Sequence, residues 1–213
     1  MSAGSKTDLV TLALIWPGSL HVYGFRTLLE MMELDQWAQV SAPTVYRAIG
    51  RLEAAGFLQV VEERVGNAPP RRLCTLTDAG REELRRLTRA ALADREWGSG
   101  LFELGMCLCF ALTAEEVLPL LAERRRALAR VDEECLQKMP FHHNAGIESA
   151  CIMLRYGRLS YQAMERAAQE WEALLRARPL YFAEMAMGIQ QLVQRGAADG
   201  AEMAVAEETS DEA

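Results

Sequence analysis

The feature that most constrains the fold of this chain is a change in hydrophobic period near residue 57. Before it, apolar residues recur every three or four positions in the segments 8–16, 19–32 and 41–56, as on one face of a helix. After it, residues 57–64 are rich in Val and Phe, and the run GNAPP at 66–70 has strong turn chemistry before a second strand at 71–76. The sequence therefore predicts three helices followed by a two-stranded hairpin, which is the element order of a winged helix-turn-helix.

The third predicted helix, 41–56, has two distinct faces. Ser41 can cap its start, and Pro43 suits the first turn, where a missing N–H has no helical partner to lose. Its apolar face consists of Val45, Ala48, Ile49 and Leu52, and its opposite face of Arg47, Gly50, Arg51 and Ala54. Such a helix can bury one face on two other helices and present the other to the major groove of DNA.

We therefore expect DNA contacts from this helix and from the hairpin. Arginine can donate two hydrogen bonds to a guanine edge or bind phosphate. Hydroxyl groups at a helix N-terminus suit phosphate oxygens, and adjacent arginines at a hairpin suit phosphate or the minor groove. The candidates are Ser41, Thr44, Tyr46, Arg47, Arg51, Arg64, Asn67, Arg71 and Arg72. The simpler alternative, that the hairpin arginines only solvate a turn, is less favoured because they follow a capped helix with an arginine face.

Together these segments resemble the PadR family of bacterial transcriptional regulators. The resemblance rests on LHVY at 20–23, TVY at 44–46 with RLEAAG at 51–56, PRR at 70–72 and LTDAGR at 76–81. It implies a homodimer that binds a roughly palindromic operator, usually as a repressor, and that a small effector releases. It also implies a helical C-terminal dimerisation domain. Three features depart from the family pattern: Val22 replaces a usual Gly, Arg47 replaces a usual Pro, and Leu73-Cys74 stand where tyrosines are usual.

The net charge of −7 is unusual for a DNA-binding protein, but it is unevenly distributed. Residues 1–89 hold 11 Lys/Arg and 10 Asp/Glu, a balance of +1, and residues 90–195 hold 12 and 14, a balance of −2. Residues 196–213 hold 6 acidic and no basic side chains. A segment of this composition is typical of a disordered, solubilising tail, although it can also compete for a basic surface. The charge therefore does not exclude DNA binding.

The second half of the chain is predicted to be helical. Thr113 and Glu116 have the spacing of a capping box, and the Pro/Gly-bounded stretch 139–146 is expected to interrupt the helix. From residue 147 to 192, apolar residues follow alternating steps of three and four, with Arg158, Glu165 and Arg178 as imperfections and Pro179 as a kink or break.

An apolar stripe of this kind, here called the seam, needs partner helices from the same chain and from a second subunit. We expect a dimer interface that includes Leu154, Tyr161, Trp171, Leu175 and Phe182. The predicted organisation is mainly α. It has a winged helix-turn-helix over 1–89, an all-α dimerisation and possible effector domain over 90–195, and an acidic tail over 196–213.

The second half also contains residues that suggest an effector pocket and a metal site. A small apolar or aromatic effector could bind a pocket lined by Trp97, Phe102, Met106, Phe110 and Trp171, although each residue alone is more simply a core residue. The residues Cys107, Cys109, Cys135, His142 and His143 suggest a metal site. The first two chelate poorly on a helix, because residues two apart point in nearly opposite directions. We predict no metal and no cofactor.

Other function classes are disfavoured by the sequence. The apolar stretch 101–112 is too short to span a bilayer, and residues 1–7 have no apolar signal core, so we expect a cytoplasmic protein. The five scattered cysteines fit reduced thiols. No nucleophile–base set or phosphate loop is visible, so we expect no enzyme. The prediction is an effector-responsive, DNA-binding repressor that acts as a homodimer. The alternatives are a thiol- or metal-responsive regulator and a winged helix that binds only proteins.

Overall fold

The computed structural model describes residues 3–64, 71–94, 96 and 99–191. The chain divides into two compact units, and each is described by itself. The first comprises the described residues within 1–88, 106–112 and 182–213, and the second those within 89–105 and 113–181. The segments 106–112 and 182–191, which the sequence assigned to the second domain, thus belong to the first unit.

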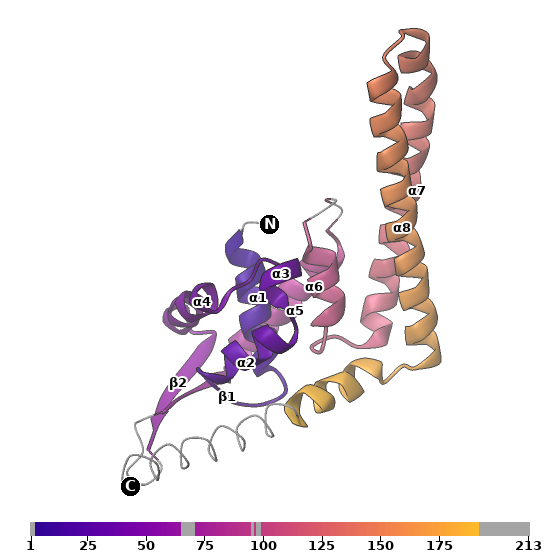
Figure 1. The fold of residues 1–213 in the computed structure, drawn as a ribbon. Coiled ribbons are helices and arrows are strands. Elements are labelled where there is room, and N and C mark those ends of the chain that lie inside the picture. The colour runs from indigo at the N-terminus through magenta and orange to yellow at the C-terminus, as the bar shows by residue number, and fades with distance from the viewer. Residues whose placement is uncertain (1–2, 65–70, 95, 97–98, 192–213) are drawn as a thin grey trace, which may run out of the picture. The chain divides into compact units, whose positions relative to one another are not determined.

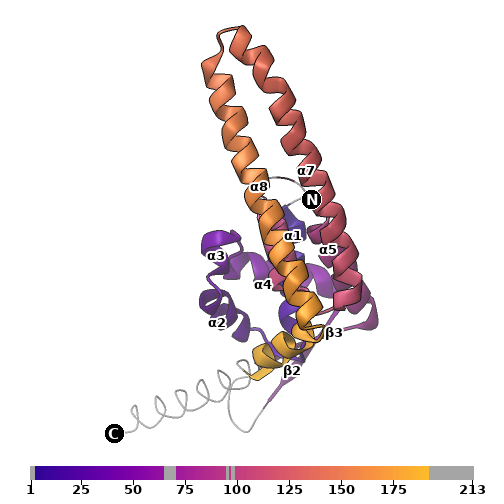
Figure 2. The same ribbon diagram turned by 90° about the vertical axis from the view of Figure 1, so that its right-hand side faces the viewer.

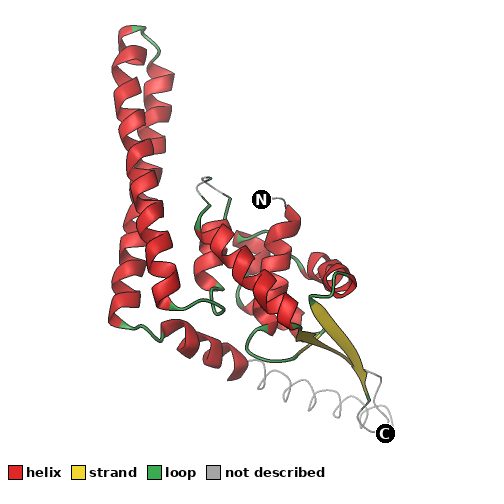
Figure 3. Cartoon of the chain, turned by 180° about the vertical axis from the view of Figure 1, so that it is seen from behind, coloured by secondary structure: helices red, strands yellow, loops and turns green. Residues whose placement is uncertain are grey.

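The first unit contains the predicted winged helix-turn-helix (Figure 1). Its elements are α1 (Ala3–Ile15), β1 (Leu20–His21), α2 (Gly24–Met31), α3 (Leu34–Trp37), α4 (Ala42–Ala54), β2 (Leu58–Glu63), β3 (Arg71–Leu76) and the start of α5 (Asp78–Leu92). The hairpin of β2 and β3 projects beyond the helices of this unit, and in Figure 3 the described strands gather there. No helix among the described residues is both long and apolar enough to cross a membrane.

Two predicted details of this unit are wrong. Residues 19–32 do not form one helix, because Leu20 and His21 pair antiparallel with Cys74 and Leu73 of β3, and α2 begins only at Gly24. The sheet therefore has three strands in the order β1-β3-β2 rather than two. The short helix α3 was also not expected; it follows Glu33, whose left-handed backbone ends the preceding turn.

The apolar face of α4 forms the centre of this unit. Val45, Ala48, Ile49 and Leu52 are all buried, as predicted. They join buried residues of the neighbouring helices, which include Leu9, Leu12 and Ala13 of α1 and Phe25, Leu28 and Leu29 of α2. Burying a side chain of the Val or Leu class contributes about 1.5–3 kcal/mol. This burial determines which face of α4 is exposed to solvent.

A tight junction joins the end of α4 to the start of α5. Gly56 ends α4 with a positive φ of 77°, a conformation that glycine adopts without steric cost. The hydroxyl of Thr77 donates to the carbonyl oxygen of Gly56 at 2.8 Å and accepts from the N–H of Gly80 at 3.0 Å. A Cβ atom at Gly80 would lie 2.0 Å from the carbonyl oxygen of Phe57. Only glycine therefore fits at this junction without movement of the backbone.

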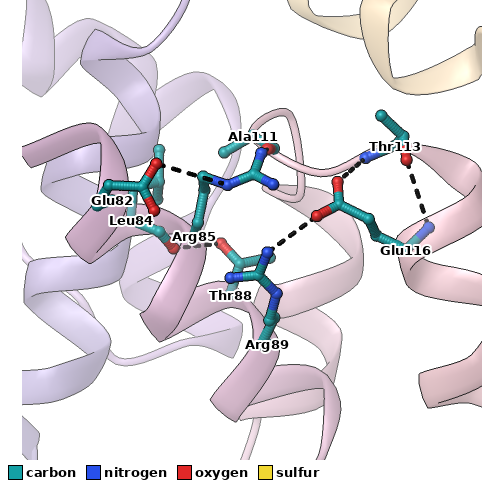
Figure 4. Close-up of polar contacts among 8 residues, drawn as sticks. All are labelled: Glu82, Leu84, Arg85, Thr88, Arg89, Ala111, Thr113 and Glu116. Carbon is teal, nitrogen blue, oxygen red and sulfur yellow. Dashed lines mark hydrogen bonds and ion pairs between the residues drawn. The ribbon is translucent and has the colours of Figure 1, made fainter. Parts of the chain in front are cut away.

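Within the first unit, α5 also holds the segment 106–112 (Figure 4). The guanidinium of Arg85 donates to the carbonyl oxygen of Ala111 and lies 4.0 Å from a carboxylate oxygen of Glu82. Leu108 and Cys109 in this segment are fully buried. The segment is therefore part of the core of the winged-helix unit.

The second unit is built around two long antiparallel helices, α7 (Ala114–Asn144) and α8 (Glu148–Ala177), which run side by side (Figure 2). The predicted capping box is present: the N–H of Glu116 donates to Thr113 Oγ1, and the N–H of Thr113 donates to the Glu116 carboxylate. Glu116 also pairs with Arg89 at 2.9 Å (Figure 4). Helix α8 ends before Pro179, as expected, and residues 181–191 are helical again.

The predicted interruption of the helix between residues 139 and 146 is present, but it begins after Asn144 rather than at Pro140. Helix α7 continues through Pro140 to Asn144, so His142 and His143 are helical rather than in a loop. A proline inside a helix costs about 3 kcal/mol, and packing along the length of α8 can offset that cost. The turn between the helices contains Gly146, as expected, with a φ of 68°.

The polar imperfections of the α8 seam have partners on α7. Arg158 Nε donates to Asp132 Oδ1 at 2.8 Å, and Gln162 donates to the same carboxylate at 3.2 Å. Arg125 of α7 pairs with Glu172 at 3.1 Å and with Glu165 at 3.7 Å. The seam therefore has an intrachain partner along its length, with ion pairs alternating with buried residues such as Ala168 and Leu175.

Candidate nucleic-acid interface

The face of α4 opposite the core is exposed. Arg47, Gly50, Arg51 and Ala54 are exposed on it, as predicted, and Tyr46 is exposed on its flank. Nothing lies within 4 Å of a Cβ atom built on Gly50, so the centre of this face is low and open. A helix surface with small residues between two arginines can approach the floor of a groove closely.

The N-terminus of α4 is closed by its own side chains. The hydroxyl of Thr44 donates to the carbonyl oxygen of Ser41 at 2.6 Å, and the N–H of Ser41 donates to Thr44 Oγ1 at 3.2 Å. The Thr44 hydroxyl proton is thereby used within the cap, whereas a phosphate oxygen needs a donor. Phosphate binding by Ser41 and Thr44 stays a prediction, and for Thr44 it requires that this hydroxyl turn.

The two arginines of α4 are held differently. Arg47 Nε donates to the carbonyl oxygen of Pro43, one turn earlier, at 3.3 Å. Arg51 donates through Nη2 to the Asp8 carboxylate of α1. Arg51 remains 53% exposed, whereas Asp8 is 22% exposed. Arg51 is thus anchored at one edge while about half of its side chain remains exposed.

The arginines of the hairpin also have partners within the protein. Arg72 lies 3.6 Å from Glu53 of α4, with both side chains largely exposed. The Arg71 guanidinium lies 5.8 Å from the centre of the Tyr23 ring, which stacks on His21 at 5.5 Å. Arg64 is exposed, and Asn67 lies outside the described residues. The hairpin is therefore joined to α4 and to the β1–α2 connection through its arginines.

Three residues at this surface were missed by the sequence analysis: Asp8, Glu53 and Tyr23. Asp8 lies 43 positions before its partner, so no local period or motif connects them. Glu53 belongs to the same helix as Arg51, but its contact with Arg72 depends on how the hairpin folds back. Tyr23 and Glu53 lie in the LHVY and RLEAAG segments that supported the family resemblance, whereas Asp8 lies in neither and carried no signal.

Two buried thiols have perturbed acidity. Burial raises the pKa of Cys74 to about 11, and it raises the pKa of Cys109 well above its ordinary value. The reactive form of cysteine is the thiolate, so both groups are chemically quiet at neutral pH. Among the described residues, no cluster of three His, Cys, Asp or Glu side chains is arranged to hold a metal ion.

The other predicted sites are distributed over the two units. In the second unit Leu175 is buried, while Leu154, Tyr161 and Trp171 are half-buried, and the Trp171 ring meets Tyr181 at 5.9 Å. Phe182 is buried in the first unit. Of the predicted pocket, Met106 and Phe110 are buried in the first unit and Phe102 in the second, and Trp97 lies outside the described residues. The dimer interface and the pocket stay predictions.

Comparison with known proteins agrees with the winged-helix assignment. Residues 12–86 match the model of the transcriptional regulator PadR-like family. The protein smu.1604c from Streptococcus mutans UA159 is similar in structure, with 15% identity, a TM-score of 0.38, and coverage of 81% of this chain and 99% of that one.

Bacillus subtilis PadR in complex with operator DNA is a second similar structure, with 15% identity, a TM-score of 0.35, and coverage of 76% of this chain and 98% of that one. No curated protein sequence matches the chain. Because both TM-scores are below 0.5, we rest the functional conclusion on the family match.

Proposed function

We propose that this chain is a sequence-specific DNA-binding transcriptional regulator, proceeding from the PadR-like winged helix-turn-helix that residues 12–86 form. The observation that carries the proposal is the geometry of α4. One face is buried in the core, and the opposite face presents Arg47 and Arg51 around the open position at Gly50. This is the arrangement that a recognition helix needs in order to enter a major groove.

In the proposed complex, α4 reads base edges and the hairpin contacts the DNA backbone. Arg47 replaces the proline usual in the family and extends from the middle of the exposed face, so we assign it to base or phosphate contact in the groove. Arg64, Arg71 and Arg72 are placed on or beside the hairpin, where phosphate or minor-groove contact is the expected role. Each phosphate neutralised steepens the fall of log K with log salt by about 0.9.

We further propose that the regulator acts as a homodimer on a palindromic operator. Two recognition helices must lie about 34–36 Å apart to enter successive major grooves, and a dimer supplies the second helix. On α8, Ile152, Tyr156 and Leu159 follow a spacing of four and three residues and are exposed. That apolar face supports an interface in addition to the predicted residues, of which Leu175 and Phe182 are already covered within one chain.

Repression and its release by a small apolar or aromatic effector are the finer parts of this proposal. They follow from the family resemblance. The large apolar side chains Phe102, Met106 and Phe110 are each buried in the core. They could contact such a ligand only if the surrounding core rearranged.

The direct test is selection of binding sites from genomic DNA fragments by the purified protein. We expect a palindromic site to be enriched, with affinity that falls steeply as salt rises from low to moderate concentration. Arg47→Ala should weaken that binding at least tenfold. Arg166→Ala is the matched control, because Arg166 is a highly exposed arginine of α8 that, among the described residues, pairs with its neighbour Glu170.

If the purified protein is folded and no DNA fragment is enriched, the proposal is contradicted. It would favour the alternative in which the winged helix binds only proteins, and Arg47→Ala and Arg71→Ala would then leave DNA binding unchanged. A thiol-responsive regulator is supported less, because burial keeps Cys74 and Cys109 protonated.

A further inference from the structure

Arg51 differs from the other arginines of the candidate interface in having a fixed carboxylate partner from another helix. Its guanidinium donates to Asp8 of α1, and Asp8 is less exposed than Arg51. Among the described residues, Arg47 has no carboxylate partner and bonds only to its own helix. The pair Arg72–Glu53 is longer, at 3.6 Å, and more exposed on the carboxylate side.

A guanidinium held in this way loses freedom but keeps most of its donors. Arginine has five N–H groups, so the contact with Asp8 leaves an edge that can still address a guanine. A charge-assisted hydrogen bond is about twice as strong as a neutral one, and it limits the orientations that a long side chain can sample. The direction of the free edge is therefore set from α1 rather than from α4.

The same carboxylate also changes the balance between specific and non-specific binding. Phosphate attraction depends on net charge and is independent of base sequence, and the negative charge of Asp8 offsets that of Arg51. Base recognition depends instead on the direction of the donors. We propose that Asp8 is a specificity-determining positioning residue: it holds Arg51 for base contact and suppresses its use as a general phosphate clamp. This inference rests on the proposed DNA-binding function.

The test compares the wild-type protein with Asp8→Asn, which removes the charge and keeps the size. Binding is measured to the selected operator, to operators with each base pair changed, and to a scrambled duplex, over a range of salt. We expect Asp8→Asn to bind the scrambled duplex about three- to tenfold more tightly, with a salt slope steeper by about 0.9, as for one additional phosphate contact. Discrimination at one base pair per half-site should fall about tenfold, while the other positions keep theirs.

Two controls separate positioning from charge and from folding. In an Arg51→Gln background, Asp8→Asn should leave base discrimination unchanged and should raise scrambled affinity no more than the loss of one negative charge does in Glu53→Gln. Glu53→Gln removes the same negative charge beside a different arginine, and it should raise scrambled binding without loss of discrimination at the base pair that Asp8→Asn affects. Circular dichroism and thermal unfolding verify that each variant is folded.

Three results would overturn the inference. These are unchanged discrimination in Asp8→Asn, a loss of discrimination by Asp8→Asn that persists without Arg51, or an identical pattern for Glu53→Gln. If the wild-type protein selects an operator and Asp8→Asn behaves like it, only the role of Asp8 fails. If the wild-type protein selects none, the proposed function fails, and the inference with it.

Discussion

At the residue scale, the start of α5 approaches the backbone of Phe57 so closely that Gly80 has no room for a side chain. Gly80 lies against the carbonyl oxygen of Phe57 where α5 starts, and the hydroxyl of Thr77 joins the same turn to Gly56. This junction fixes where the hairpin leaves the helices. The LTDAGR segment predicts the start of a helix. It does not predict this junction, because the atom that excludes a side chain at Gly80 is the carbonyl oxygen of residue 57.

Gly80→Ala should destabilise the protein by about 1–3 kcal/mol, the range for overpacking a site that cannot relax easily. The neighbour is a backbone oxygen, so no side-chain rotation relieves the clash. Gly50→Ala is the matched control, because it adds the same methyl group in open space within a helix and should stabilise by about 0.5–1 kcal/mol. Urea unfolding followed by circular dichroism measures both, and equal effects would contradict this reading of the junction.

The buried thiols lead to a second prediction at this scale. Cys74 and Cys109 should react with a thiol reagent at pH 8 much more slowly than a free cysteine, because burial raises the pKa of each. Reaction should become fast for all five cysteines in denaturant. Mass spectrometry of labelled peptides assigns the sites. Rapid labelling of either residue in the folded protein would revive the thiol-responsive alternative.

At the element scale, periodicity predicted most helices, while contacts between distant segments decided the exceptions. The apolar face of α4 and the seam of α8 are visible in the sequence. The strand Leu20–His21 was read as helix because its partner, β3, lies about fifty residues later. Pro140 was read as a break because its neighbour α8 cannot be seen locally. Likewise, the basic face of α4 was predicted, but the hydrogen bond from Arg51 on that face to Asp8 of α1 was not.

The seam between α7 and α8 should make stability depend on acid pH. The hydrogen bond from Arg158 lowers the pKa of Asp132 below its ordinary value. The contribution of this carboxylate to stability is therefore present above its unfolded pKa, about 3.9, and is lost as pH falls through the lower folded value. We expect the melting temperature of Asp132→Asn to lie below that of the wild type at pH 6–7.

That difference in melting temperature should shrink as the pH falls below about 4. The carboxylate of Asp132 then becomes protonated and neutral, as the asparagine side chain is at every pH. Glu170→Gln serves as the control, because Glu170 forms an exposed pair one turn from Arg166 and such pairs contribute little. A constant difference between wild type and Asp132→Asn at all pH values would contradict the assignment.

At the scale of the whole molecule, most of the negative charge lies in residues 196–213, and the winged-helix segment that carries the proposed function is nearly neutral. The winged-helix segment carries nearly equal numbers of acidic and basic side chains, and Asp8 and Glu53 place two of the acids directly beside interface arginines. Composition could show the balance but not these pairings. The protein should therefore depend on shape and base contacts more than a strongly basic DNA-binding protein does.

The proposed homodimer yields a prediction at this scale. Leu159→Glu, on the exposed apolar face of α8, should shift the protein from dimer to monomer in sedimentation velocity and weaken operator binding at least tenfold. Met187→Glu is the control, because Met187 is similarly exposed on the helical segment 181–191 of the first unit. A monomeric wild-type protein, or a dimer unaffected by Leu159→Glu, would exclude this surface.

The first unit is discontinuous along the chain, since the segment that contains Phe182 belongs to it although the whole second unit precedes that segment. Domains generally fold as units during synthesis, the N-terminal one first. Here the ribosome must synthesise the whole second unit before Phe182 can reach its buried position. A nascent chain halted before residue 182 would therefore hold a winged helix whose core is incomplete, and the proposed operator binding would arise only after the second unit has been synthesised.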